Sequence, residues 1–256
     1  MKLIDTHCHL NDEALYKDLD NVISRALQTG VEKMIVIGWD EESSKLAIKI
    51  AEQYPFIYAC VGFHPENLEN IDDEALNRVL KMSSHEKVVG IGEIGLDYHW
   101  EKDPDKREIQ KEFFVKQIEY ANKVGLPISI HSREAFSDTL EILNKHKPLY
   151  GGVMHCYSGS ADNIKDIINL GLYIGLDGPV TFKNAKTPKE VAEEIPLDKL
   201  VLETDSPYLS PHPLRGTVNE PANLILIADE IANIRGMSKK HLLEVVYDNS
   251  CRLFKL

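Results

Sequence analysis

Six side chains that can bind metal ions lie at or just beyond the ends of short apolar segments. They are four histidines and two acidic residues: His7, His9, Glu93, His131, His155 and Asp205. A charged group at the end of a buried strand is costly unless it is paired or bound to a metal. Four imidazoles and two carboxylates suit Zn²⁺, Mn²⁺ or Fe²⁺, whereas Mg²⁺ and Ca²⁺ prefer mostly oxygen ligands. The set therefore predicts a metal centre.

The size of this set favours two metal ions over one. One catalytic zinc ion needs fewer than six ligands, because it keeps an open coordination position. Two divalent ions about 3.5–4 Å apart that share Glu93 as a bridge fit the set better. Gly92 and Gly95 flank Glu93 and let a ligand approach the backbone closely. The metal identity stays open among Zn, Mn, Mg and Fe, and a structural role is the alternative for any single histidine.

Short apolar segments and stretches with helical spacing alternate along the whole chain. The expected strands are 2–5, 34–38, 57–62, 88–93, 127–131, 152–155, 172–176 and 200–205. The expected helices are 17–29, 41–54, 72–84, 105–123, 134–146, 163–170, 189–194, 222–234 and 238–253. This alternation predicts an α/β fold, a (β/α)8 TIM barrel that forms a single domain over residues 1–256.

A doubly wound open sheet is the competing fold. It would usually show a glycine-rich phosphate turn after an early strand, and the sequence has none. In a barrel, the carboxyl ends of all the strands open onto one face, where active sites lie. We therefore expect the six metal-binding side chains to converge on one cavity.

Composition limits the cellular setting and the kind of partner. The 256 residues carry 29 basic and 41 acidic side chains, a net charge of −12, which argues against a broad nucleic-acid or membrane surface. The four cysteines are far apart and indicate reduced thiols; Cys8 should pack on the face opposite His7 and His9. Without a signal-peptide core or a bilayer-spanning apolar run, we expect a cytoplasmic protein with no membrane association and no obligate protein partner.

Seven short motifs run through nearly the whole chain. They are DTHCH (5–9), GFHP (62–65), GEIGLDY (92–98), HSRE (131–134), HCYSG (155–159), ETDSPYL (203–209) and NEP (219–221). Together they resemble the TatD-type deoxyribonucleases of the metal-dependent amidohydrolase superfamily. The resemblance implies that His7, His9 and Asp205 hold one metal, that His131 and His155 hold the other, and that Glu93 bridges the two.

The same resemblance implies hydrolysis of phosphodiester bonds in DNA. The predicted activity is a 3′–5′ exonuclease that prefers single strands or frayed ends as its substrate. The family commonly has a basic residue after Arg215 and Gly216, whereas this chain has Thr217 and Val218. That departure removes an expected phosphate contact.

Asp205 and Glu93 are the expected catalytic residues. Two cations would lower the pKa of a bridging water and neutralise charge on the attacked phosphoryl group. Asp205 would orient this water and take its proton, while Glu93 holds the two metals together. Glu203 shares the face of Asp205, so an outer-shell role is expected for it.

Five further residues are candidates for binding the substrate. Arg133 and Arg215 would contact phosphate, with a surface salt bridge as the alternative for Arg133. His64 follows the third strand and would lie in the outer metal shell or bind a phosphate oxygen, with a structural cap as its alternative. Tyr98 and Trp100 would stack on an unpaired base, and packing over the barrel rim is the alternative for Trp100.

Two other functions remain open at this point. A hydrolase of amides, esters or lactones on a small molecule would use the same activated water. A metal-dependent binding protein without turnover is the other possibility. Glu93, in place of a lysine that could be carbamylated, and the basic Arg133 favour phosphate. The complete ligand set and Asp205 favour an enzyme.

Overall fold

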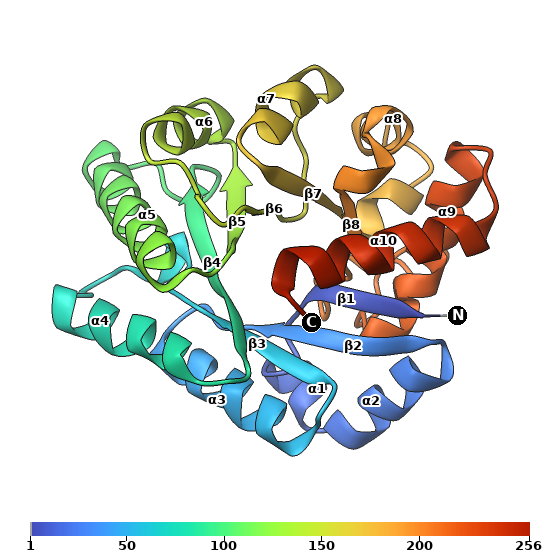
Figure 1. Ribbon diagram of the computed structural model, residues 1–256, viewed down its shortest axis with the longest axis horizontal. Coiled ribbons are helices and arrows are strands. Elements are labelled where there is room, and N and C mark those ends of the chain that lie inside the picture. The colour runs from blue at the N-terminus through green and yellow to red at the C-terminus, as the bar shows by residue number, and fades with distance from the viewer. Residues whose placement is uncertain (1) are drawn as a thin grey trace.

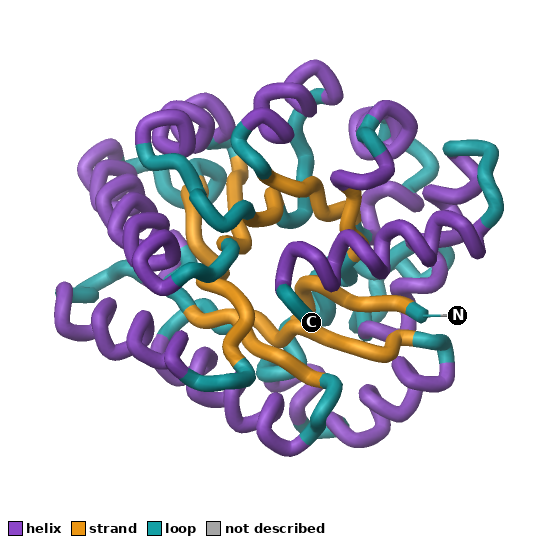
Figure 2. The backbone as a smooth tube through the Cα atoms, in the orientation of Figure 1, coloured by secondary structure: helices purple, strands orange, loops and turns teal. Residues whose placement is uncertain are grey.

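Eight parallel strands form one sheet that curves into a barrel, and the helices surround it (Figures 1 and 2). The computed structural model describes residues 2–256. The strands are β1 (Leu3–Cys8), β2 (Val31–Ile37), β3 (Ile57–Val61), β4 (Val88–Asp97), β5 (Ile128–Arg133), β6 (Gly152–Met154), β7 (Leu172–Leu176) and β8 (Leu200–Leu202). They pair in chain order from β1 to β8. The predicted (β/α)8 barrel is confirmed, and the alternative of a doubly wound open sheet is wrong.

The nine expected helices are present, and a short additional helix, α1, precedes the first of them. The helices are α1 (Glu13–Tyr16), α2 (Leu19–Gln28), α3 (Glu41–Gln53), α4 (Asp73–Lys81), α5 (Pro104–Val124), α6 (Phe136–Lys145), α7 (Ile164–Asn169), α8 (Thr187–Glu194), α9 (Leu224–Ile234) and α10 (Lys239–Phe254). Asp72 caps α4, because its side chain accepts a hydrogen bond from the Ala75 amide at 2.8 Å. Within residues 2–256, no helix is long and apolar enough to cross a membrane.

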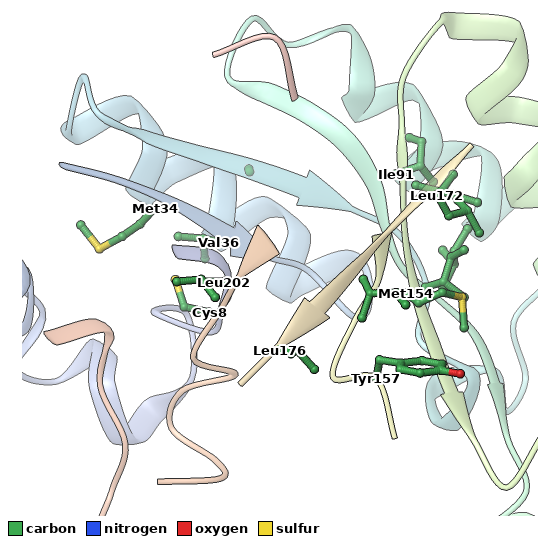
Figure 3. Close-up of a cluster of buried hydrophobic side chains, with 14 of the residues drawn as sticks. Cys8, Met34, Val36, Ile91, Met154, Tyr157, Leu172, Leu176 and Leu202 are labelled. Carbon is green, nitrogen blue, oxygen red and sulfur yellow. The ribbon is translucent and has the colours of Figure 1, made fainter. Parts of the chain in front are cut away.

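In β2, β3, β4, β6, β7 and β8, neighbouring residues belong to two separate apolar layers. In β2, Met34 and Val36 pack in the layer that also contains the helix residues, whereas Ile35 and Ile37 pack inside the barrel. Figure 3 shows Val36 and Cys8 close together in the outer layer. Cys8 is thus the packed thiol expected opposite His7 and His9, and burial raises its pKa well above the ordinary value.

The C-terminal segment closes one end of the barrel. Figure 1 shows α10 crossing this end, with the C-terminus near the centre. Leu253 and Phe254 pack against inner-layer residues such as Ile35 and Val153. Apolar side chains therefore fill the amino end of the strands, and the carboxyl end remains for polar groups.

Hydrogen bonds between β1 and the segment after β8 close the barrel. The Asp205 amide donates to the His7 carbonyl at 2.9 Å, and the His9 amide donates to the Ser206 carbonyl at 2.7 Å. Cys8 and Ser206 also form a parallel bridge. The first and last candidate metal ligands along the chain therefore become neighbours.

A buried carboxylate reinforces this closure. Asp5 in β1 accepts hydrogen bonds from the Thr204 amide at 3.0 Å and from the Thr204 hydroxyl at 2.6 Å. Burial raises the pKa of Asp5 to about 7, although the Thr204 hydrogen bonds oppose that shift. Because both residues are fully buried, neither has water as an alternative partner.

Two strand boundaries differ from the expectation in ways that matter for the site. Glu93 lies inside β4, because pairing with β5 continues as far as Asp97 and Arg133. β8 ends at Leu202, so Asp205 belongs to the connecting segment after the strand. The barrel seam, with its bonds to β1, sets the position of Asp205.

Replacing Thr204 by valine tests the seam. Thr204→Val removes the hydroxyl donor to Asp5 while the side-chain volume stays similar, which leaves a buried carboxylate oxygen without its partner. We expect a loss of about 1–3 kcal/mol in the free energy of unfolding, measured by urea denaturation. The control Thr217→Val, at an exposed position, should stay within about 0.5 kcal/mol of the wild type. Equal stability of the two variants would contradict the role of the seam.

Candidate metal centre

The six predicted metal-binding side chains come together at the carboxyl end of the barrel. A cavity of about 660 Å³ opens there, and five of the six line it: His9, Glu93, His131, His155 and Asp205. His7 is fully buried and lies 3.5 Å from Glu93 and 3.7 Å from Asp205, measured between the nearest polar atoms. Residues from three strands, β1, β4 and β5, thus meet residues from the segments that follow β1, β6 and β8, as expected.

His7, His9 and Asp205 form the first compact donor group. The Nε2 atoms of His7 and His9 are 3.2 Å apart. Asp205 Oδ1 lies 3.7 Å from His7 Nε2 and 3.4 Å from His9 Nε2. Two ligand atoms at about 2.0–2.1 Å from a tetrahedral zinc ion lie roughly 3.3–3.4 Å apart. The spacing of this group therefore fits a cation held between the three side chains.

Glu93 faces two different sets of histidines with its two oxygens. Oε2 lies 3.5 Å from His7 Nε2 and 3.9 Å from His9 Nε2. Oε1 lies 3.0 Å from His131 Nδ1 and 3.8 Å from His155 Nε2. A carboxylate that offers one oxygen to each set has the arrangement needed to bridge two cations.

The cavity is strongly polarised, as its pKa shifts indicate. Burial acts to raise the pKa of Glu93, but the electrostatic effect of the nearby His64 and hydrogen bonds from His131, His64 and His7 outweigh it and hold the pKa well below the ordinary value. Burial and the neighbouring His155 lower the pKa of His7 to about 4. The carboxylate is therefore ionised and His7 is neutral near pH 7, which are the forms that bind a metal. Burial acts to lower the pKa values of His131 and His155, but neighbouring carboxylates outweigh it and raise them to about 9 and about 10, so these two rings must lose a proton when a metal binds.

Buried acceptors fix the tautomers of two of the histidines. His155 Nδ1 donates to Glu203 Oε1 at 3.0 Å, so Nε2 is the nitrogen that would give up its proton to a cation in the cavity. His131 Nε2 lies 2.9 Å from Asp97 Oδ2 and Nδ1 lies 3.0 Å from Glu93 Oε1. Asp97 therefore keeps the proton on Nε2, and Nδ1 is the nitrogen that would give up its proton to a cation in the cavity. An acceptor behind a metal-binding histidine orients the ring and raises its basicity.

These acceptors differ in how well the sequence predicts them. Glu203 has the outer-shell position expected for it, and its Oε1 also accepts from the Cys156 amide at 2.5 Å. Asp97 has no role in the sequence prediction, although it belongs to the GEIGLDY motif. The sequence could have indicated this role, because side chains alternate between the two faces of a strand. β4 continues through Gly95, so Asp97, four residues after Glu93, lies on the same face as Glu93.

Arg133 and Trp100 line the cavity together. The Arg133 guanidinium lies 5.6 Å from the centroid of the Trp100 ring, and Trp100 is 63% exposed. The neighbouring Glu134 pairs with His99 and Lys102 instead of Arg133. Because Arg133 forms no salt bridge with any other described residue, its charge is available to a ligand.

Two of the expected substrate-binding residues lie elsewhere. The prediction that Tyr98 stacks on a base is wrong, because its ring is buried and its hydroxyl donates to Asp138 at 2.7 Å. Arg215 is not among the residues that line the cavity, and its guanidinium lies 4.0 Å from the centroid of the Phe182 ring. The positive charge of Arg215 therefore lies over the Phe182 ring, away from the cavity lining.

Two aromatic residues that were not predicted complete the wall beside His9. The Trp39 ring meets the His9 ring edge-on at 5.3 Å, and the Tyr208 ring meets it at 6.0 Å between centroids. Both side chains line the cavity. Tyr208 belongs to the ETDSPYL motif, and Trp39 follows the second strand and Gly38. Both residues follow strand ends, and this position could have indicated that they line the cavity.

Comparison with known proteins shows the family to which the chain is related. The family described as TatD related DNase matches residues 4–255. The uncharacterized metal-dependent hydrolase YabD of Bacillus subtilis is 45% identical, with 99% of both chains covered. The uncharacterized metal-dependent hydrolase YcfH of Escherichia coli is 36% identical over all of this chain and 97% of its own. The crystal structure of YJJV, a TatD homolog from Escherichia coli, superposes with a TM-score of 0.94 at 31% identity, covering 99% of this chain and 98% of that one.

Asp97→Asn tests whether the acceptor behind His131 matters for metal binding. Asp97 Oδ1 accepts from the His99 and Trp100 amides, so the oxygen of the new asparagine would stay at that position. Its NH₂ group would then point at His131 Nε2, and two hydrogen-bond donors would face each other. His131 would change tautomer and lose its lone pair toward the cavity. We expect 10–100-fold weaker binding of Zn²⁺ or Mn²⁺ in calorimetric titrations, with an unchanged fold.

Asp138→Asn is the matched control for this experiment. It removes the same charge near the same loop, but Asp138 contacts Tyr98 and Lys111 and no histidine. Its metal affinity should equal that of the wild type. If Asp97→Asn also binds metal as tightly as the wild type, the tautomer argument is wrong.

Proposed function

This chain belongs to the TatD family of metal-dependent hydrolases, and on that premise we propose that it hydrolyses phosphodiester bonds in DNA with two divalent metal ions. The observation that carries the proposal is the position of Glu93, whose two oxygens face separate sets of histidines. His7, His9 and Asp205 would hold one ion, and His131 and His155 the other, with Glu93 as the bridge.

Asp205 is the residue that would accept a proton from the attacking water. Bound divalent ions supply the Lewis acidity that lowers the pKa of water and neutralises charge on the phosphoryl group. Burial acts to raise the pKa of Asp205, but the His155 charge and a hydrogen bond with His9 outweigh it and keep this pKa below the ordinary value. Asp205 is therefore ionised near neutral pH and can orient the water and take its proton.

Arg133 and Trp100 would bind the substrate beside the metals. The unpaired Arg133 guanidinium can fork onto a phosphate, and contact with Trp100 limits its freedom. The exposed Trp100 ring offers a face for stacking, which an unpaired base can reach and a base in a duplex cannot. These features support a preference for single strands or frayed ends, with 3′–5′ exonuclease action as the proposed mode.

Hydrolysis of an amide, ester or lactone on a small molecule is the second candidate function. The cavity of about 660 Å³ lies within the range of roughly 300–1,000 Å³ for small-molecule sites, and this observation favours that candidate. Arg133 favours phosphate, because a neutral substrate would leave its charge without a partner.

A substrate screen with added metal decides between the two candidates. The protein would be incubated with Zn²⁺, Mn²⁺ or Mg²⁺ and with single-stranded DNA, RNA, a simple phosphodiester and an aryl ester. We expect shortening of single-stranded DNA labelled at its 5′ end and turnover of the phosphodiester. Turnover of the aryl ester alone would support the second candidate and reject the first.

Asp205→Asn should lose most of the turnover, because an amide cannot accept the proton. General-base groups typically contribute about 10²–10⁴-fold to the rate, so kcat on single-stranded DNA should fall by that order. Asp229→Asn, at the surface, should keep the wild-type rate. A rate for Asp205→Asn within a few-fold of the wild type would remove this residue from the role of base.

Single-stranded DNA should be degraded faster than blunt duplex. With a net charge of −12, the protein repels a long duplex, so binding depends on a few contacts near the metals. Trp100→Ala should raise KM on single strands more than it lowers kcat, whereas Tyr150→Ala, at an exposed aromatic away from the cavity lining, should change neither. Cleavage of blunt duplex at an equal or higher rate would contradict the local-contact picture.

A further inference from the structure

His64 lies among the candidate metal ligands, but its hydrogen bonds distinguish it from them. It follows β3 and begins the 3₁₀ helix η1 (Pro65–Asn67). Its Nδ1 atom accepts a hydrogen bond from the Glu66 amide at 3.2 Å. A ring nitrogen that accepts a hydrogen bond carries a lone pair, so the proton of a neutral imidazole resides on the other nitrogen, Nε2.

The same arrangement occurs at His85, far from the cavity. His85 Nδ1 accepts from the Lys87 amide at 3.2 Å, two residues along the chain. Its Nε2 lies 3.1 Å from Glu52 Oε1 and can donate to that carboxylate. His85 shows that this backbone cap leaves Nε2 as a hydrogen-bond donor.

In the cavity, distance alone would place His64 in the second metal group. His64 Nε2 lies 3.5 Å from Glu93 Oε1, and the rings of His64 and His131 are 4.4 Å apart. The three side chains have donor atoms close enough to hold an ion. However, Nε2 could bind a metal only if Nδ1 carried the proton, and Nδ1–H would then face the Glu66 N–H.

His131 and His155 have the opposite arrangement. The nitrogen of each that points away from the cavity meets a carboxylate, Asp97 or Glu203, and therefore carries the proton. Their cavity-facing nitrogens are therefore the ones that would give up a proton and offer a lone pair when a cation binds. His64 instead offers an N–H to the same space, and its side chain is 12% exposed there.

We propose that His64 binds a phosphoryl oxygen of the substrate through Nε2–H and is not a metal ligand. The proposal rests on the proposed function, because it takes phosphate as the group that enters the cavity. Glu93 Oε1 lies 3.5 Å from Nε2, and a bridging role for Glu93 engages that oxygen. A phosphoryl oxygen then becomes the acceptor that His64 lacks, and Arg133 lines the same cavity as a second phosphate partner.

Two substitutions separate the two nitrogens of His64. In His64→Gln, the amide N–H occupies about the position of Nε2, so the donor is kept. In His64→Asn, the side-chain oxygen can accept from the Glu66 amide as Nδ1 does, so the cap is kept and the donor is lost. Thermal unfolding of both variants verifies that they fold.

Two measurements on the metal-loaded protein test the proposal without using DNA. Elemental analysis should find the wild-type amount of metal in both variants, whereas His155→Ala, the control for a lost ligand, should lose metal. Calorimetric titration with inorganic phosphate should give affinity about ten- to a hundredfold weaker for His64→Asn and within about threefold of wild type for His64→Gln. His85→Ala removes the equivalent cap outside the cavity and should leave phosphate affinity unchanged.

Each alternative result would overturn the proposal. Loss of metal from His64→Asn would make His64 a ligand. Wild-type phosphate affinity in that variant, or no measurable phosphate binding by the wild type, would remove the contact. Equal weakening in both variants would reject Nε2–H as the donor. Failure of the wild type to hydrolyse DNA is a separate outcome that would reject the proposed function, while the phosphate titration still reports on His64.

Discussion

The burial of an ionised carboxylate at the centre of the barrel is the constraint on which the site depends. Glu93 lies inside a strand and is almost fully buried, where an isolated negative charge would be very costly. Its oxygens are within 3.9 Å of nitrogen atoms from five histidines: His7, His9, His64, His131 and His155. These residues lie in, or just after, four other strands, so the carboxylate can be stabilised only when the barrel is assembled.

Barrel closure places the remaining carboxylate. Asp205 lies near the end of the chain, whereas His7 and His9 lie near its beginning, and the seam between β1 and the segment after β8 joins them. Asp5 stabilises the seam from inside through its bonds to Thr204. The opposite end of the barrel is filled by apolar side chains from α10. Stability and chemistry therefore depend on opposite ends of the same strands.

The sequence predicts the fold and the convergent residues well, because both depend on repeating local patterns. Apolar segments with polar residues at their ends indicate strands and a shared face. The hydrogen-bond partners of the side chains depend on register between strands, which one segment does not contain. Asp97 gained its role because β4 extends along β5, and Tyr98 lost its predicted role because its hydroxyl meets Asp138 from α6. The tautomer of His64 likewise depends on the turn that follows it.

Anomalous scattering from crystals grown with Mn²⁺ or Zn²⁺ tests the central claim most directly, because it locates the ions without reference to activity. The account predicts two peaks about 3.5–4 Å apart on either side of Glu93, one beside His7, His9 and Asp205 and the other beside His131 and His155. His64 Nε2 should lie outside the coordination distance of both peaks. A single peak, or a peak coordinated by His64 Nε2, would contradict the account.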